Sequence, residues 1–186
     1  MVRGMSVVES AEAELKEAAA QFYERKQLLA FAASYALASA LGAALKQPAV
    51  AGAGLALVGA SAVLFKKIIS SKIEAVREAW DLLLDIKGLD TKLIQNPEER
   101  KELEELIQTK YSKFKRVVAY VKDVAEELKG KASLAFALYG AGSGLASSSL
   151  AFSLPWPVSL ATYAIMTLLF VTPLPSIVYE LREVVT

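Results

Sequence analysis

The chain contains neither cysteine nor histidine. The first absence excludes disulfides, thiolate metal ligands and cysteine nucleophiles, and the second excludes the usual proton shuttle near neutral pH. Asparagine occurs only at position 96, whereas glutamate, lysine and alanine are abundant, a bias that is typical of proteins from thermophiles. We therefore expect a protein that is not an enzyme and that uses no cofactor, no metal and no small-molecule substrate.

Charge is also missing from two long stretches, although 22% of all residues are charged. Residues 132–179 contain no Lys, Arg, Asp or Glu, and residues 27–65 contain only Lys46. Hydrophobic residues make up 54% of the chain, against roughly 45–50% in ordinary soluble domains. Uncharged segments of this length indicate a lipid environment, or a seam that is fully buried inside a large assembly.

Each uncharged stretch predicts two apolar helices joined by a turn that contains proline. The first pair is Leu28–Leu45 and Ala49–Phe65, and the second is Ala132–Leu154 and Val158–Tyr179. At 1.5 Å per residue the helices of the first pair would be roughly 25–27 Å long, slightly less than the hydrocarbon core of about 30 Å. A hairpin that crosses a thin membrane and a wedge that does not fully cross both fit this length. Pro173 and Pro175 are expected to kink or end the last helix.

An amphipathic helix is predicted before the first apolar pair. Ser6-Val7-Val8-Glu9 has the pattern of a capping box, in which the Ser and Glu side chains satisfy free backbone amides. The helix would carry one apolar stripe, formed by Val8, Ala11, Leu15, Ala18 and Phe22. Such a stripe lies on a membrane surface or packs against a partner helix, and the alanine content favours the partner helix.

The central region, residues 66–131, has heptad spacing instead of an uncharged composition. One apolar series ends near Gly88 and Asp90, and a second helix is expected to begin at Asn96-Pro97. The first series is Ile69, Ile73, Val76, Trp80 and Leu83, and the second is Tyr111, Phe114, Val118, Val121, Ala125 and Leu128. These series predict an antiparallel helical hairpin, with the alternative that each helix docks separately on another surface.

Together these patterns predict an all-α protein in five segments. An N-terminal amphipathic helix occupies residues 1–27, and a polar tail occupies residues 180–186. Two apolar hairpins, residues 28–65 and 132–179, supply four membrane-type helices, and residues 66–131 join them. The ends of the two apolar hairpins also suggest an internal repeat, because Leu29-Ala30-Phe31-Ala32 recurs as Leu134-Ala135-Phe136-Ala137 and Leu64-Phe65 as Leu169-Phe170. Duplication and coincidence in Ala/Leu-rich helices both explain this recurrence.

The distribution of basic residues predicts an orientation. Of the 21 Lys and Arg residues, 15 lie in residues 66–131 and only Lys46 lies in a turn between apolar helices. The positive-inside rule then places both termini and residues 66–131 on the cytoplasmic or interior side, with the two turns on the other side. Four lysines at the ends of the apolar segments are expected to anchor to lipid headgroups; they are Lys66, Lys67, Lys129 and Lys131.

The apolar helices carry small residues at four-residue spacing, which allows helix backbones to approach closely. Three such ridges are candidate helix-packing sites: Ala32, Ala36, Ala40 and Ala44; Gly52, Ala56 and Ala60; and Gly140, Gly144 and Ser148. Contacts within one chain and contacts between neighbouring subunits both remain open.

Patterns that would indicate other chemistry are incomplete. Gly140-Ala-Gly-Ser-Gly144 lacks the preceding strand and the Lys of a phosphate-binding loop, and the serines at 147–149 have no base. No ionisable residue other than Lys46 lies in the apolar segments, which argues against a proton-coupled carrier. The basic cluster Lys110, Lys113, Lys115 and Arg116 is best explained as a solvated helix face. Contact with anionic headgroups or nucleic acid stays an alternative, which the net charge of +1 does not favour.

The layout of two apolar hairpins around a polar stretch resembles that of the reticulon-type membrane-shaping domain. Short Ala/Gly-rich hairpins with a Lys or Pro turn are also similar to coat proteins of spindle-shaped archaeal viruses and to conjugative pilins. The resemblance covers Leu28–Leu45, Ala49–Phe65 and 132–179. It implies hairpins that pack side by side into a membrane-like or filamentous wall.

We therefore expect a structural protein that associates with itself and with lipid, located in a membrane or in the wall of a virion or filament. The alternative function is that of a small channel, carrier or accessory subunit of a larger membrane complex. A soluble assembly that covers its apolar helices with protein is a third alternative.

Overall fold

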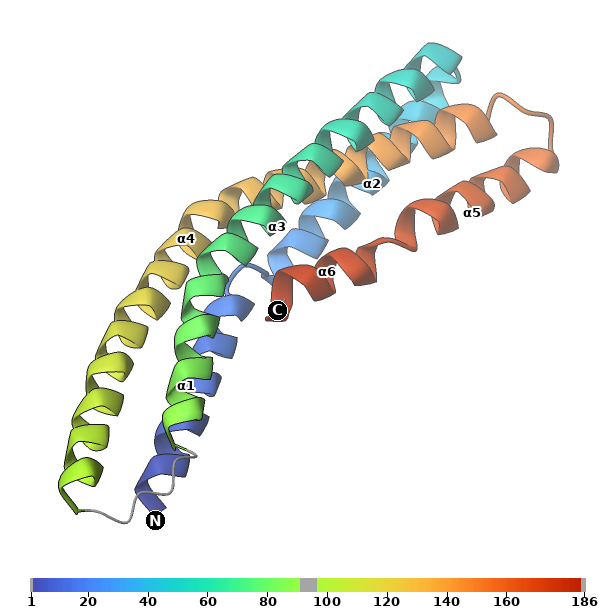
Figure 1. The fold of residues 1–186 in the computed structure, drawn as a ribbon. Helices are drawn as coiled ribbons and strands as arrows, with labels where there is room; N and C mark the ends of the chain where they lie inside the picture. Colours follow the sequence, from blue (N-terminus) through green and yellow to red (C-terminus); the bar gives the residue numbers. More distant parts are fainter. Residues whose placement is uncertain (1, 91–96, 185–186) are drawn as a thin grey trace. The chain divides into compact units, whose positions relative to one another are not determined.

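A computed structural model describes residues 2–90 and 97–184 of the chain (Figure 1). These residues form helices and turns without any strand, which confirms the all-α prediction for the described part of the chain. The helices are α1 (Val2–Ala20), α2 (Arg25–Leu45), α3 (Pro48–Asp90), α4 (Pro97–Ala151), α5 (Val158–Val171) and α6 (Leu174–Arg182).

Prolines begin or end several helices, as the sequence indicates. Pro48 and Pro97 are the first residues of α3 and α4, positions that need no amide donor. Pro173 separates α5 from α6, and α5 is closed by a hydrogen bond from the Thr172 amide to the Leu168 carbonyl. Lys46 follows α2 with a φ of 50° and donates its amide to the Gly42 carbonyl, so a left-handed residue closes that helix.

Other predicted boundaries are wrong. α1 begins at Val2, so Ser6 lies inside the helix and not at its start. α3 and α4 each continue without a break from apolar into polar sequence, past the boundaries predicted near residues 65 and 131. A change of composition does not interrupt a helix, because every backbone group is paired within the helix itself. Gly88 lies within α3, and Asn96 lies outside the described residues.

The chain divides into two compact units. Unit 1 comprises Met1–Phe22, Ser70–Glu127 and Leu181–Thr186, within the described limits. Unit 2 comprises Tyr23–Ile69 and Leu128–Glu180. α3 and α4 therefore each contribute one part to unit 1 and another part to unit 2.

In unit 1 the apolar face of α1 packs against other helices of the same chain. Ala11, Leu15, Ala18 and Phe22 are buried, so the predicted stripe packs against helices. The partners are parts of α3 and α4, as the ion pair of Glu12 with Lys87 and the hydrogen bond of the Tyr111 hydroxyl to Glu14 show. The N-terminal helix is thus a third member of the helical region predicted from residues 66–131.

The heptad prediction is correct for α4 and wrong in detail for α3. Phe114, Val118, Val121 and Ala125 of α4 are buried. In α3, however, Ile73 is 39% exposed, and the buried series is Lys72, Ala75, Val76, Ala79, Leu82, Leu83 and Ile86. α3 contacts both α1 and α4, so its buried face is wider than a single coiled-coil seam and is centred differently.

The contacts between α3 and α4 in unit 1 run antiparallel. Lys110 pairs with Asp85, and Lys113 pairs with Glu78 at 3.5 Å. Residues further along α4 therefore contact residues earlier in α3.

Unit 2 is organised around the second part of α4. This part of α4 runs parallel to α2, because Phe31 lies beside Gly140 and Gly42 lies beside Ser148. It runs antiparallel to α3, because Phe136 contacts Phe65 while Gly142 contacts Gly54. It also runs antiparallel to α5, because Tyr139 contacts Phe170 while Phe152, the residue after α4, contacts Tyr163. The turn between α2 and α3 and the turn between α4 and α5 consequently lie at the same end of unit 2 (Figure 1).

Three helical segments among the described residues have the length and apolar composition that a membrane span requires. They are Val7–Leu45, Pro48–Leu89 and Val158–Arg182. The sequence pattern predicts four such helices, but the apolar part of α4 is not among the three. That part is rich in Gly and Ser, and most of its residues are buried.

Candidate functional site

The predicted ridge on α4 is in close contact with α2. Gly140, Gly144 and Ser148 are buried. A Cβ atom at Gly140 would lie 2.3 Å from the Phe31 carbonyl oxygen, and one at Gly144 would lie 2.5 Å from the Tyr35 carbonyl oxygen. Both distances are far below a van der Waals contact, so α2 approaches the bare backbone of α4.

A second face of α4 approaches α3 as closely. A Cβ atom at Gly142 would lie 2.5 Å from the Gly54 carbonyl oxygen, and one at Gly54 would lie 2.6 Å from the Gly142 carbonyl oxygen. A Cβ atom at Gly42 of α2 would lie 2.2 Å from the hydroxyl oxygen of Ser148. The ridges proposed from the sequence omit Gly42, Gly54 and Gly142.

A signal for these three residues was present in the sequence. Glycine inside a helix costs about 1 kcal/mol relative to alanine. Its use within otherwise alanine-rich helices therefore requires a reason, and close backbone approach is one. Four-residue spacing alone does not distinguish such a glycine from an alanine on an open face.

The other two predicted ridges lie on open faces of unit 2. Ala32, Ala36, Ala40 and Ala44 of α2 are all exposed, as are Gly52, Ala56 and Ala60 of α3. An added Cβ atom at Gly52 would meet nothing within 4 Å. The buried face of α2 is formed instead by Gln27, Phe31, Ala38 and Gly42.

Large apolar side chains flank these open ridges. Leu37 is 75% exposed, and the exposed apolar surface extends over α2, α3 and α5. Its main members are Leu29, Leu41, Leu55, Val63, Ile165, Leu168 and Leu169. So many exposed large apolar side chains are unusual for helices that face water.

An aromatic cluster surrounds Tyr139 inside unit 2. The Tyr139 ring lies 5.8 Å from Phe31, 6.4 Å from Phe65 and 6.5 Å from Phe170, and its hydroxyl donates to the Phe170 carbonyl at 2.7 Å. Phe136 meets Phe65 edge to face at 4.9 Å. The four phenylalanines of the possible internal repeat therefore gather at one place, where edge-to-face ring pairs stabilise the packing.

The lysines proposed as headgroup anchors differ in their surroundings. Lys66 and Lys67 are exposed on α3, and Lys131 is exposed on α4. Lys129 is more covered and pairs with Glu24 at 3.2 Å. In the basic cluster of unit 1, Lys110 and Lys113 pair with acidic residues of α3, and Lys115 lies 4.9 Å from the Tyr111 ring centre. These contacts favour a solvated helix face over a site for anions.

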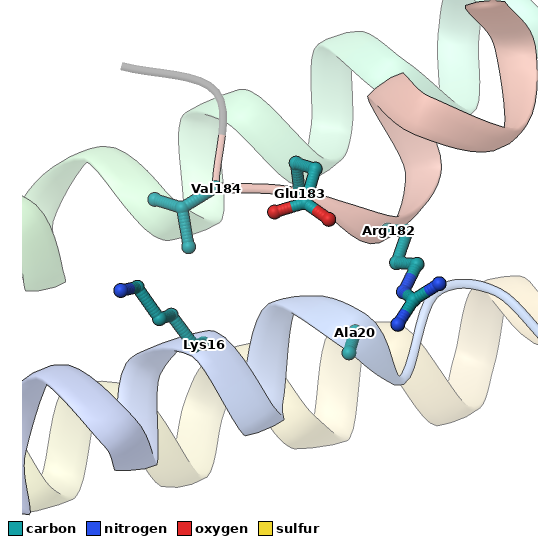
Figure 2. A pocket seen from close by; sticks show the side chains of 5 residues that line it. All are labelled: Lys16, Ala20, Arg182, Glu183 and Val184. Atoms are coloured by element: carbon teal, nitrogen blue, oxygen red, sulfur yellow. The ribbon is translucent and has the colours of Figure 1, made fainter.

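A shallow hollow of about 180 Å³ lies in unit 1, between α1 and the residues that end α6 (Figure 2). Lys16 and Ala20 line one side, and Arg182, Glu183 and Val184 line the other. Lys16 forms an ion pair with Glu12 at 2.9 Å. The hydrogen bond to Glu12, the charge of Glu12 and, more weakly, the charge of Glu183 raise the pKa of Lys16. Acidic groups thus balance the basic groups at this hollow, so the local charge does not select an anion.

The carboxylate of Glu12 in unit 1 contacts two lysines. It accepts hydrogen bonds from both Lys16 and Lys87, each at 2.9 Å. These two contacts lower the pKa of Glu12 to about 2. The two lysines keep this carboxylate ionised, and the contact with Lys87 connects α1 to α3.

No group of three or more acidic side chains that could hold a metal ion occurs within residues 2–90 and 97–184. No protein-family model, curated protein or solved structure matches the chain.

Proposed function

We propose that this protein is a non-enzymatic structural protein of membranes, whose copies associate through small-residue ridges into a layer or filament wall. The observation that carries the proposal is the exposure of two ridges, Ala32 to Ala44 on α2 and Gly52 to Ala60 on α3, amid large apolar side chains. Lipid tails and other apolar helices solvate such a surface equally well, so close backbone packing is what would favour association with a second copy.

In this proposal unit 2 is the part embedded in lipid, and it is built from two hairpins, α2 with α3 and α4 with α5. α4 fills the centre and contributes the glycines that hold the hairpins together, while α2, α3 and α5 present apolar side chains outward. The layer-like arrangement agrees with the families that the sequence layout resembles.

The proposed orientation places both turns of unit 2 on one side of the membrane and residues 66–131 on the other. It is supported by the charge distribution and by the location of the two turns at the same end of unit 2. Charged residues of unit 1 would then lie in water, where surface ion pairs such as Lys113 with Glu78 carry no large desolvation penalty.

Ala36→Trp tests the association without disturbing the protomer, because Ala36 is exposed. Its matched control is Leu37→Trp, a change at the next residue, which is also exposed but lies off the ridge. We expect the wild type and Leu37→Trp to form oligomers in mild detergent and ordered polymers after detergent removal, and Ala36→Trp to form neither. Sedimentation and electron microscopy measure both states.

Two results would contradict the proposal. One is a wild-type protein that stays a monodisperse monomer both in gentle detergent and without it. The other is equal loss of association in both tryptophan variants, because it would place the contact outside the ridge.

A further inference from the structure

The charged residues of unit 2 are mostly basic. Residues 23–69 and 128–180 contain seven Lys and Arg residues but only two acidic residues, Glu24 and Glu180, so this unit has a net charge of +5. The whole chain has a net charge of only +1, and the residues of unit 1 therefore have a net charge of −4. The basic excess belongs to the unit that the proposed function embeds in lipid.

Six of the seven basic residues lie at one end of unit 2. Lys129 pairs with Glu24 at 3.2 Å, which brings the start of α2 beside this part of α4. Phe65 of α3 contacts Phe136 of α4, so the two residues after Phe65 lie at the same end. The six residues are Arg25, Lys26, Lys66, Lys67, Lys129 and Lys131. The two turns of unit 2 lie at the opposite end, where Lys46 is the only charged residue (Figure 1).

An exposed aliphatic side chain lies about one helical turn from an exposed basic residue on each of three helices. The pairs are Lys26 with Leu29 on α2, Lys67 with Val63 on α3, and Lys131 with Leu134 on α4. Residues three or four apart lie on the same face of a helix, and in each pair the aliphatic residue is the one nearer to the turns. The surface of unit 2 thus changes from apolar to cationic at a similar level on three helices.

A phospholipid layer makes the matching change, from acyl chains to phosphate groups. A free phosphate or a nucleic acid would use the cations but not the aliphatic side chains beside them. Among the described residues, Arg25, Lys26, Lys66 and Lys67 form no ion pair, whereas Lys129 pairs with Glu24. These four cations are therefore the ones that can contact headgroups.

We propose that this end of unit 2 is a binding site for anionic phospholipids, whose headgroups contact Arg25, Lys26, Lys66 and Lys67. A zwitterionic headgroup carries its own positive charge, so the basic excess favours headgroups with a net negative charge. The inference names the lipid partner of unit 2. It rests on the embedding of unit 2 in lipid that the proposed function includes, and it does not depend on association between copies.

Reconstitution of the full chain into phosphatidylcholine vesicles tests this preference. A trace of spin-labelled phosphatidylglycerol or spin-labelled phosphatidylcholine is added, and electron paramagnetic resonance measures the fraction of each that the protein immobilises. We expect the wild type to bind the phosphatidylglycerol probe roughly two- to fivefold more strongly than the phosphatidylcholine probe. Added salt should lower this preference, because salt screens exposed charges.

The double variant Lys66→Gln, Lys67→Gln removes two of the four cations and should lower the preference toward equal binding. Its matched control is Lys115→Gln, Arg116→Gln, which removes the same charge from two adjacent exposed positions of unit 1 and should keep the preference. Ala36→Trp should also keep it, because the site lies within one copy.

The possible failures are distinguishable. Equal immobilisation of the two probes by the wild type would overturn the inference and leave the embedding in lipid intact. Equal loss of preference in both double variants would also overturn it, because the preference would then follow the total charge. If neither probe is immobilised, unit 2 is not embedded in lipid, and the inference is overturned together with that part of the proposed function.

Discussion

The Nζ atom of Lys72 donates a hydrogen bond to the main-chain carbonyl oxygen of Glu183, more than a hundred residues later in the chain. Lys72 is fully buried in unit 1, and its Nζ atom also lies 5.8 Å from the centre of the Phe22 ring. One side chain of α3 therefore contacts both Phe22, two residues after α1, and Glu183, the residue after α6. A buried polar group of this kind stabilises a particular arrangement, because it must keep its partners.

Replacing Lys72 with Met should loosen the segment around Glu183. Met retains most of the apolar side chain and removes the donor, and a hydrogen bond from a charged group is worth about 1.5–3 kcal/mol. We expect amide hydrogen exchange at residues 181–183 to accelerate by roughly tenfold or more. Lys67→Met, at an exposed lysine of the same helix, is the control. Equal exchange in the two variants would show that Lys72 does not hold this segment.

Gly142→Ala should destabilise unit 2. The added Cβ would lie 2.5 Å from the backbone oxygen of Gly54, so the two helices must move apart, at a cost of about 1–3 kcal/mol. Gly130→Ala in the same helix meets nothing within 4 Å and should stabilise the helix by up to about 1 kcal/mol. Thermal unfolding followed by circular dichroism compares the two. A Gly142→Ala protein as stable as the wild type would contradict the close contact.

Acid should weaken the contact between α1 and α3. Lys16 and Lys87 lower the pKa of Glu12 to about 2, from an ordinary value of 4.5. Because the pKa in the folded protein is the lower one, this stabilisation is fully present above pH 4.5 and is lost as the pH falls toward about 2. NMR titration of the Glu12 side chain should give a midpoint well below 4.5. The midpoint should rise in Lys16→Gln and in Lys87→Gln, and an unchanged midpoint in both variants would exclude these lysines as its cause.

The orientation can be mapped with single cysteines, because the natural chain has none. Gln47→Cys and Ser153→Cys report on the two turns of unit 2, and Ser112→Cys reports on α4 in unit 1; all three positions are exposed. In sealed vesicles, an impermeant maleimide should label either both turn positions or only Ser112→Cys, depending on vesicle orientation. Labelling of a turn position together with Ser112→Cys, in vesicles shown to be sealed, would contradict the proposed topology.

Patterns with a local physical cause were predictable from the sequence. Pro48, Pro97 and Pro173 mark helix ends because proline lacks an amide donor. The stripe from Ala11 to Phe22 and the series from Phe114 to Ala125 are buried because helical periodicity places each on one face. The ridge of Gly140, Gly144 and Ser148 was also found by its spacing, and α2 packs against it.

Patterns that depend on the number of neighbours were not predictable. The buried face of α3 is shifted from the Ile73 register because α1 joins α4 in covering it. Likewise, Ala36 and Gly144 have the same kind of spacing, but Ala36 is exposed and Gly144 is covered by α2. Periodicity defines a face of a helix, whereas coverage of that face depends on which other helix reaches it.

The sequence by itself determined that the chain is helical, that residues 27–65 and 132–179 avoid charge, and that the turns at Lys46 and Pro155 interrupt them. These properties follow from backbone geometry and from transfer free energies of single side chains, which need no knowledge of neighbours. Only the tertiary structure decided that α4 takes the centre of unit 2 and that Gly42, Gly54 and Gly142 allow its approach. Close packing is a property of two surfaces together, so it is decided when the helices meet.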